Sequence, residues 1–245
     1  MLKYLIALAS ILLLTTGLKA QKAISCKKAI SQIQEIGKST APTEYTFIQE
    51  TIQFKENSTD TSIWHETVKH PGFFRIDFGD LNKGNSDKYI GDSVYIYRNF
   101  ELKTVRHNPH PFLYFEGEVY TKSTDEALND FTRFKLDYKQ CYVVKEGYLI
   151  GSNNTKKNNN YVLLSKENAG ILSIQAEIEK GQKYRAVVTE RQTINGKNYP
   201  KIIEFYIGDR LIQSETYLSV ETSKSVPASF FNTEKQLNPE HWATK

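Results

Sequence analysis

Apolar and polar residues alternate along most of the chain between residues 45 and 220. The clearest run is 171–179, where Leu172, Ile174, Ala176 and Ile178 alternate with polar side chains. A period of two gives a strand one buried face and one wet face, as in an antiparallel sheet. The same pattern predicts strands at 45–54, 62–69, 73–78, 88–97 with a break at Gly91-Asp92, 101–106, 140–150, 161–165, 171–179, 183–192, 199–207 and 210–220.

Two segments follow a helical period instead. In residues 23–36 the apolar positions fall at helical spacing, and Gly37 is the expected C-cap. A second helix is predicted from the capping box that runs from Ser123 to Glu126, with an apolar side made of Ala127, Leu128, Phe131 and Phe134.

Turns and loops separate these elements. Asn195-Gly196 and Gly208-Asp209 predict hairpin turns. The prolines in 107–111 (His-Asn-Pro-His-Pro) exclude regular structure there, and an apolar group at 112–115 follows in or near the loop. Residues 153–160 are polar and predict a hairpin loop.

A sheet of about ten or eleven strands tends to curl, and the two helices need a surface on which to bury their apolar faces. The expected fold is therefore mainly β with helices (α+β): an unclosed antiparallel β-barrel whose concave face is covered by the helices.

The first twenty residues predict a signal peptide. Lys3 precedes an apolar run that is too short to span a membrane, and the expected cleavage follows Ala20. A lipidation site at Cys26 is the alternative. Residues 21–245 are then expected to form one domain. Loss of Lys3 and Lys19 lowers the formal charge from +4 to +2, which does not indicate a nucleic-acid partner.

The two cysteines, Cys26 and Cys141, have two interpretations. An oxidising compartment permits a disulfide between them. Both also lie in apolar patterns that explain them as small buried residues, and we favour unpaired cysteines on that ground.

The sequence contains no strong catalytic motif. His107 and His110, with His65 or Glu66, could contribute metal ligands, but the flanking prolines make a plain loop the simpler explanation. Asp125 and Glu126 suit the first turn of a helix, and Asp77 alternates with Arg75 on the expected solvent face of 73–78. We expect no enzyme activity, no cofactor and no metal.

Aromatic residues are abundant, with fifteen Tyr, thirteen Phe and two Trp. Strands favour aromatic residues, so an ordinary packed core explains them. An apolar cavity for a lipid-like ligand explains them as well.

Several segments in this order resemble the LolA-like family, the periplasmic carriers and sorting proteins of outer-membrane lipoproteins, in a form similar to those of Bacteroidetes. They are Tyr-Thr-Phe-Ile-Gln-Glu at 45–50, the segment 64–78 with its His-Pro-Gly-Phe-Phe-Arg core, Asp-Ser-Val-Tyr-Ile-Tyr at 92–97, and 198–206 through Val-Pro-Ala-Ser-Phe-Phe at 226–231. The resemblance covers about residues 24–232 and implies an unclosed β-barrel capped by helices.

The resemblance also implies a function. It implies a non-catalytic periplasmic carrier, binding protein or chaperone for lipoprotein acyl chains or another lipid. The partners it implies are inner- and outer-membrane lipoprotein transfer machinery, and we expect a monomer. Where the family tends to carry an Arg that holds the lid closed, this chain has His70, a weaker donor. By strand parity and helix face, the expected cavity lining is Phe74, Ile76, Phe78, Tyr142, Val144, Tyr148, Leu128, Phe131, Phe112, Leu113 and Phe115.

Two other classes of protein remain open. One is a structural or sensor module of the same fold with a core filled by side chains. The other is a hydrolase or metal-dependent enzyme that uses His107, His110 or His65.

Overall fold

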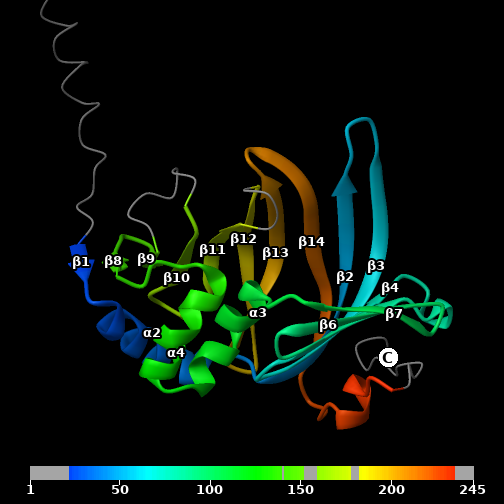
Figure 1. Cartoon of the computed structure of the whole chain (residues 1–245), viewed down its shortest axis with the longest axis horizontal. Helices are drawn as coiled ribbons and strands as arrows, with labels where there is room; N and C mark the ends of the chain where they lie inside the picture. Colours follow the sequence, from blue (N-terminus) through cyan, green and yellow to red (C-terminus); the bar gives the residue numbers. More distant parts are fainter. Residues whose placement is uncertain (1–21, 140, 152–158, 178–181, 235–245) are drawn as a thin grey trace, which may run out of the picture.

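The computed structural model describes residues 22–139, 141–151, 159–177 and 182–234 (Figure 1). The predicted signal peptide at 1–20, and most of the predicted loop at 153–160, lie outside these residues.

Fourteen strands form one antiparallel sheet among the described residues. In chain order they are β1 (Lys22–Ile24), β2 (Glu44–Phe54), β3 (Thr59–Lys69), β4 (Phe73–Phe78), β5 (Ser86–Ile90), β6 (Ser93–Arg98), β7 (Glu101–His107), β8 (Cys141–Val143), β9 (Gly147–Ile150), β10 (Tyr161–Ser165), β11 (Ile171–Glu177), β12 (Lys183–Ile194), β13 (Lys197–Ile207) and β14 (Arg210–Glu221). Every predicted strand is present, and β4 and β10 match the predicted bounds.

Three differences account for the larger number of strands. The run at 88–97 divides at Gly91 into β5 and β6, and the run at 140–150 divides into β8 and β9. Residues 23 and 24, predicted to open the first helix, instead belong to β1, which pairs with β8. The predicted turns are present: Asn195 and Gly196 both have positive φ between β12 and β13, as does Gly208 between β13 and β14.

The strand order is β1-β8-β9-β10-β11-β12-β13-β14-β2-β3-β4-β5-β6-β7. β1 and β7 are its two ends and do not pair with each other, so the barrel is unclosed, as predicted. Figure 1 shows the helices gathered in front of β8 to β12, while β2 and β3 stand to one side of them.

Helix α2 (Cys26–Thr40) begins after Ser25, whose hydroxyl accepts the Lys28 N–H, and buries Ala29, Ile30 and Ile33 against the sheet. It continues three residues beyond Gly37, the predicted C-cap. Gly37 is instead a packing residue: a Cβ there would lie 2.2 Å from the Tyr120 ring. A glycine at this point lets η2 (Glu118–Thr121) approach the helix axis.

The segment between β7 and β8 contains the other helices. Pro111 and the apolar group at 112–115 form α3 (Pro111–Glu116), where a loop was one expectation. The prediction that 107–111 holds no regular structure was wrong at both ends, because His107 is the last residue of β7 and Pro111 is the first residue of α3. The predicted capping box is confirmed at Ser123 and Glu126, and it opens α4 (Thr124–Asp130), followed by η3 (Phe131–Phe134). None of the described helices has the length and apolar character needed to cross a membrane.

The convex face of β4 to β6 is covered by the C-terminal segment with η4 (Ala228–Phe231), seen below β6 in Figure 1. Arg75 holds Asp77 through two bonds of 2.7 and 2.8 Å and donates to the Phe230 carbonyl at 2.9 Å. The expectation that Arg75 and Asp77 face solvent was therefore wrong. Alternation with a period of two separates the polar face of a strand from its apolar face. It does not show whether a segment distant in the sequence covers the polar face.

The preference for unpaired cysteines was also wrong. Cys26, at the start of α2, and Cys141, at the start of β8, form a disulfide with a Cα–Cα distance of 5.1 Å. Pairing of β1 with β8 brings the two residues together, and β1 was the strand that the helical interpretation of 23–36 had missed.

Candidate functional site

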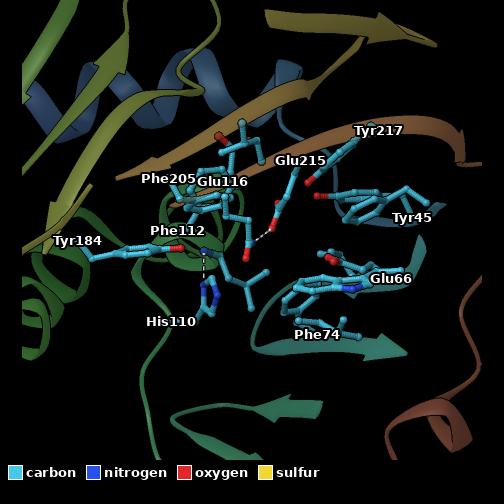
Figure 2. Close-up of a pocket in the computed structure, with 17 residues that line it drawn as sticks. Tyr45, Glu66, Phe74, His110, Phe112, Glu116, Tyr184, Phe205, Glu215 and Tyr217 are labelled. Atoms are coloured by element: carbon cyan, nitrogen blue, oxygen red, sulfur yellow. Dashed lines mark hydrogen bonds between the residues drawn. The ribbon is translucent and has the colours of Figure 1, made fainter. Parts of the chain in front are cut away.

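A cavity of about 200 Å³ lies on the concave face of the sheet beneath α3. Its wall comes from six adjacent strands, β12-β13-β14-β2-β3-β4, and its cover comes from His110 and α3. Figure 2 shows these side chains turned toward a shared space. The lining is mostly aromatic and aliphatic: Tyr45, Phe47, Trp64, Val68, Phe74, Ile76, Phe112, Leu113, Tyr184, Ile203, Phe205 and Tyr217, with the polar residues Glu66, His110, Glu116, Gln213 and Glu215.

Four of the residues predicted to line a cavity do so: Phe74 and Ile76 from β4, and Phe112 and Leu113 from α3. The others lie elsewhere. Phe78 packs edge-on against Trp64 at a centroid distance of 4.9 Å. Phe115, Phe131 and Leu128 belong to the packed core, and Tyr142, Val144 and Tyr148 lie at the other end of the sheet, in or beside β8 and β9.

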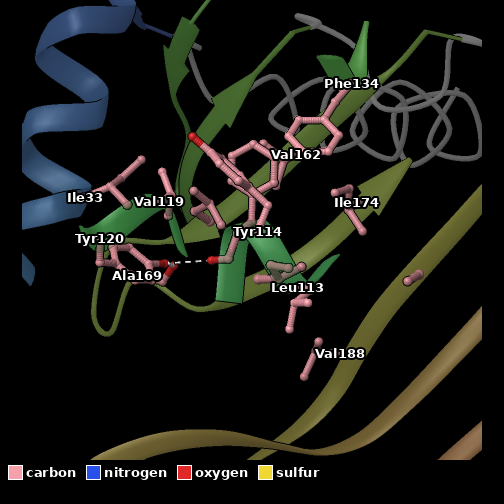
Figure 3. Packing of buried hydrophobic residues seen from close by; sticks show 14 of the residues in the cluster. Ile33, Leu113, Tyr114, Val119, Tyr120, Phe134, Val162, Ala169, Ile174 and Val188 are labelled. Carbon is pink, nitrogen blue, oxygen red and sulfur yellow. Dashed lines mark hydrogen bonds between the residues drawn. The ribbon is translucent and has the colours of Figure 1, made fainter. Parts of the chain in front are cut away.

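The reason is that the helices fill only one half of the concave face. Phe115, Phe131 and Phe134 form a continuous ring cluster with Tyr114. Figure 3 shows Tyr114 and Phe134 beside Val162 of β10 and Ile174 of β11. Strand parity correctly gives the inward side of a strand. It does not show which inward positions will face a helix and which will face open space.

His70, the predicted gate position, lies at the turn between β3 and β4 and packs against the end of α3. A Cβ on Gly117 would lie 2.1 Å from the imidazole ring. Both ring nitrogens are buried without a hydrogen-bond partner among the described residues. Burial lowers the His70 pKa to about 4, so the ring is neutral near pH 7. Its contact with the helical segment is packing, and a gating role remains a prediction.

His110 has a structural task. Its Nδ1 accepts the Leu113 N–H at 3.1 Å and so caps α3, and burial lowers its pKa to about 4 (Figure 2). Among the described residues there is no group of three or more His, Cys, Asp or Glu that could hold a metal.

Three carboxyl groups stand on the cavity wall, and we did not predict them as part of a lipid site. Glu116 is bound by Arg191 at 2.9 and 3.1 Å and accepts the Ile171 N–H at 2.9 Å. Glu66 and Glu215 have no such cation. The alternation of β3 places Glu66 between Trp64 and Val68, on the inward side of the strand.

A second, larger hollow of about 790 Å³ adjoins the first. The two have His110 and Tyr184 in common, and the hollow extends between β5 and β6 on one side and β11 on the other. Val94, Ile96, Ile174 and Ala176 form the apolar part of its wall, and the rest includes the charged residues Asp87, Arg106, Arg133, Lys135 and Glu177. We refer to this larger hollow as the outer groove and to the smaller one as the inner cavity.

The fold and its hollows define an unclosed β-barrel with helices on the concave face and an apolar cavity between the two. No protein-family model and no curated protein sequence matches the chain. Solved structures do match, and they show that the chain has the LolA-like fold, which confirms the resemblance at the level of the fold.

Three of the solved structures that resemble this one illustrate the match. A LolA superfamily protein from Nitrosomonas europaea has a TM-score of 0.53 and 8% identity, and the match covers 86% of this chain and 99% of that one. A protein domain from Vibrio parahaemolyticus, named as an outer membrane lipoprotein-sorting domain, has a TM-score of 0.56 and 11% identity over 85% and 98% of the two chains. A DUF1329 family protein from Desulfovibrio piger has a TM-score of 0.55 and 10% identity over 86% and 98%.

Proposed function

We propose that the protein is a non-catalytic periplasmic carrier or binding protein for acyl chains, from lipoproteins or from another lipid. The observation that carries the proposal is the apolar inner cavity between the sheet and α3. A hydrocarbon chain gains about 0.8 kcal/mol for each CH₂ removed from water, so a chain of about 16 carbons needs no charged anchor to bind. Displacement of α3, held by packing against His70, would then allow loading and release.

Two further observations support this proposal. The Cys26–Cys141 disulfide fits an oxidising compartment such as the periplasm. The fold is that of proteins named for lipoprotein sorting, and transfer to or from membrane machinery would be a function of the same kind.

Filling the cavity tests the proposal. Leu113 is buried on α3 and lines the inner cavity, so Leu113→Trp should occupy the space that a ligand needs. We expect the wild-type protein to take up a fluorescent fatty-acyl probe and the Leu113→Trp protein to bind it at least ten-fold more weakly. Leu218→Trp is the matched control, because Leu218 is 56% exposed.

Native mass spectrometry of protein purified from the periplasm provides an independent readout. A mass increment that extracts into organic solvent is expected. A protein that carries nothing and takes up no acyl probe would overturn the proposal.

The size of the cavity favours one alternative. Ligand pockets usually measure about 300–1,000 Å³, and the inner cavity is smaller. A structural or sensor module of the same fold, with a core filled by side chains, is therefore the second candidate. It predicts that Leu113→Trp changes stability and no binding property.

A further inference from the structure

The inner cavity has an excess of acidic groups, and this bears on what it binds. We build on the proposed function and infer the chemical class of its ligand. Among the described residues that line the cavity there is no Lys or Arg, while three are Glu.

Glu66 is the most unusual of the three. It is 4% exposed on β3 and faces the cavity between Trp64 and Val68. It makes no hydrogen bond or ion pair with any described residue. Burial raises its pKa well above the usual range, and the nearby carboxyls of Glu215 and Asp77 raise it further.

Glu215 approaches the same space from β14, on the other side of β2. It is 9% exposed and accepts hydrogen bonds from two neutral side-chain donors, Gln213 at 2.7 Å and Gln49. Burial raises its pKa to about 7. Figure 2 shows the Glu66 and Glu215 side chains turned toward the space among the labelled residues.

The other titratable groups around the cavity do not balance these acids. Arg191 already forms an ion pair with Glu116 and so does not neutralise Glu66 or Glu215. Burial keeps His110 neutral near pH 7 by lowering its pKa, and keeps Tyr45, Tyr184 and Tyr217 neutral by raising theirs.

A carboxyl group buried without a partner is unfavourable, and it becomes favourable when a cation or a strong donor reaches it. We propose that the inner cavity binds the protonated amino group of an amphiphile, with Glu66 and Glu215 as its counter-charges. The alkyl chain of that amphiphile then passes His110 and Tyr184 into the outer groove.

The geometry of the two hollows suits such a ligand. The inner cavity is large enough for an ammonium group and the first part of a chain, and the outer groove offers the apolar side chains of Val94, Ile96 and Ile174 beyond it. A fatty acid with its carboxylate inside would add one more acid to Glu66 and Glu215. A neutral alcohol can hydrogen-bond to the two acids in their protonated form, but it gains no ion pair from them.

Trp64 lines the cavity, so its fluorescence reports on binding. Trp242→Phe makes Trp64 the sole indole, since the chain has two Trp. In that background, dodecylamine, dodecanol and dodecanoic acid are titrated below their micelle concentrations at pH 8. We expect dodecylamine to bind at least ten-fold more tightly than either of the others.

The Glu66→Gln/Glu215→Gln protein keeps the shape of the site and loses its charge. It should bind dodecanol as before and prefer dodecylamine by less than three-fold. Glu190→Gln, which removes a half-exposed acid paired with Lys201, should keep the full preference. A thermal melt checks that each variant is folded.

The outcomes are distinguishable. Equal or tighter binding of the alcohol or the fatty acid overturns the amine proposal and leaves acyl-chain binding intact. An undiminished amine preference in the double Gln protein also overturns it. If none of the three ligands binds, both the amine proposal and the proposed function fail.

Discussion

Single acidic residues in the cavity wall make the stability of the fold depend on pH. An acid whose pKa is raised by folding keeps its proton where the unfolded chain has lost it. Its stabilising contribution is complete below the pKa of the unfolded chain and is lost as the pH rises through the pKa of the folded protein. Glu215, with a pKa of about 7 in the folded protein, is the clearest case.

Glu215→Gln should therefore change how stability varies with pH. The ordinary pKa of Glu is about 4.3, so the difference in unfolding free energy between wild type and Glu215→Gln should shift by about 3 kcal/mol against wild type between about pH 4 and pH 7. Urea denaturation at a series of pH values measures it. Parallel curves for the two proteins would contradict the assignment.

His70 and His110 act in the opposite sense. Their pKa values fall to about 4 on folding, so stability declines as the pH falls from about 6.5 toward 4. Because both histidines are present in wild type and in Glu215→Gln, this contribution cancels in the difference.

Among the elements, α3 is the one whose position defines the inner cavity. It is only six residues long, from Pro111 to Glu116, and the contact between His70 and Gly117 holds its end against the turn between β3 and β4. A small residue at 117 is required because the ring of His70 occupies the space where a side chain would be.

Gly117→Ala should lower the unfolding free energy by about 1–3 kcal/mol, the usual cost of overpacking. In a His70→Ala background the ring is absent, so the same change should cost less than half as much. A double-mutant cycle by chemical denaturation measures the coupling. Additive effects would mean that the ring and the glycine do not constrain each other.

The elements were predictable from the sequence to the extent that their patterns are local. Alternation gave all the main strands, and the capping box at Ser123 marked the start of α4 to the residue. The end of α2 was not predictable, because Gly37 is needed for close packing against Tyr120, a residue distant in the chain, and does not end the helix. The same limit applies to the site: Glu66 and Glu215 look like ordinary strand residues until β14, β2 and β3 are placed side by side.

At the scale of the whole molecule, one covalent link joins the N-terminal helix to the second half of the chain. Cys26 and Cys141 are 115 residues apart, and their disulfide fixes α2 against β8. Helix α2 also buries Ala29, Ile30 and Ile33, so packing should hold it in place when the link is removed.

Cys26→Ala/Cys141→Ala should lower the unfolding free energy by about 2–5 kcal/mol, because the unfolded chain regains the freedom of a long loop. The double variant should retain its fold by circular dichroism and its ligand affinity, since the cavity lies at the other half of the sheet. Thermal melts of wild type with and without reductant should reproduce the difference. An unchanged melting temperature would contradict the prediction.

The pairing of β2 with β14 joins residues from both ends of the chain, with Thr46 opposite Glu221 and Gln53 opposite Gln213. A polypeptide that emerges N-terminus first therefore has β2 and β3 long before their partner exists. The part of the inner cavity wall that β14 contributes forms only when this last strand is present, and contacts so distant in sequence form slowly. A chain that still lacks β14 therefore cannot complete the inner cavity.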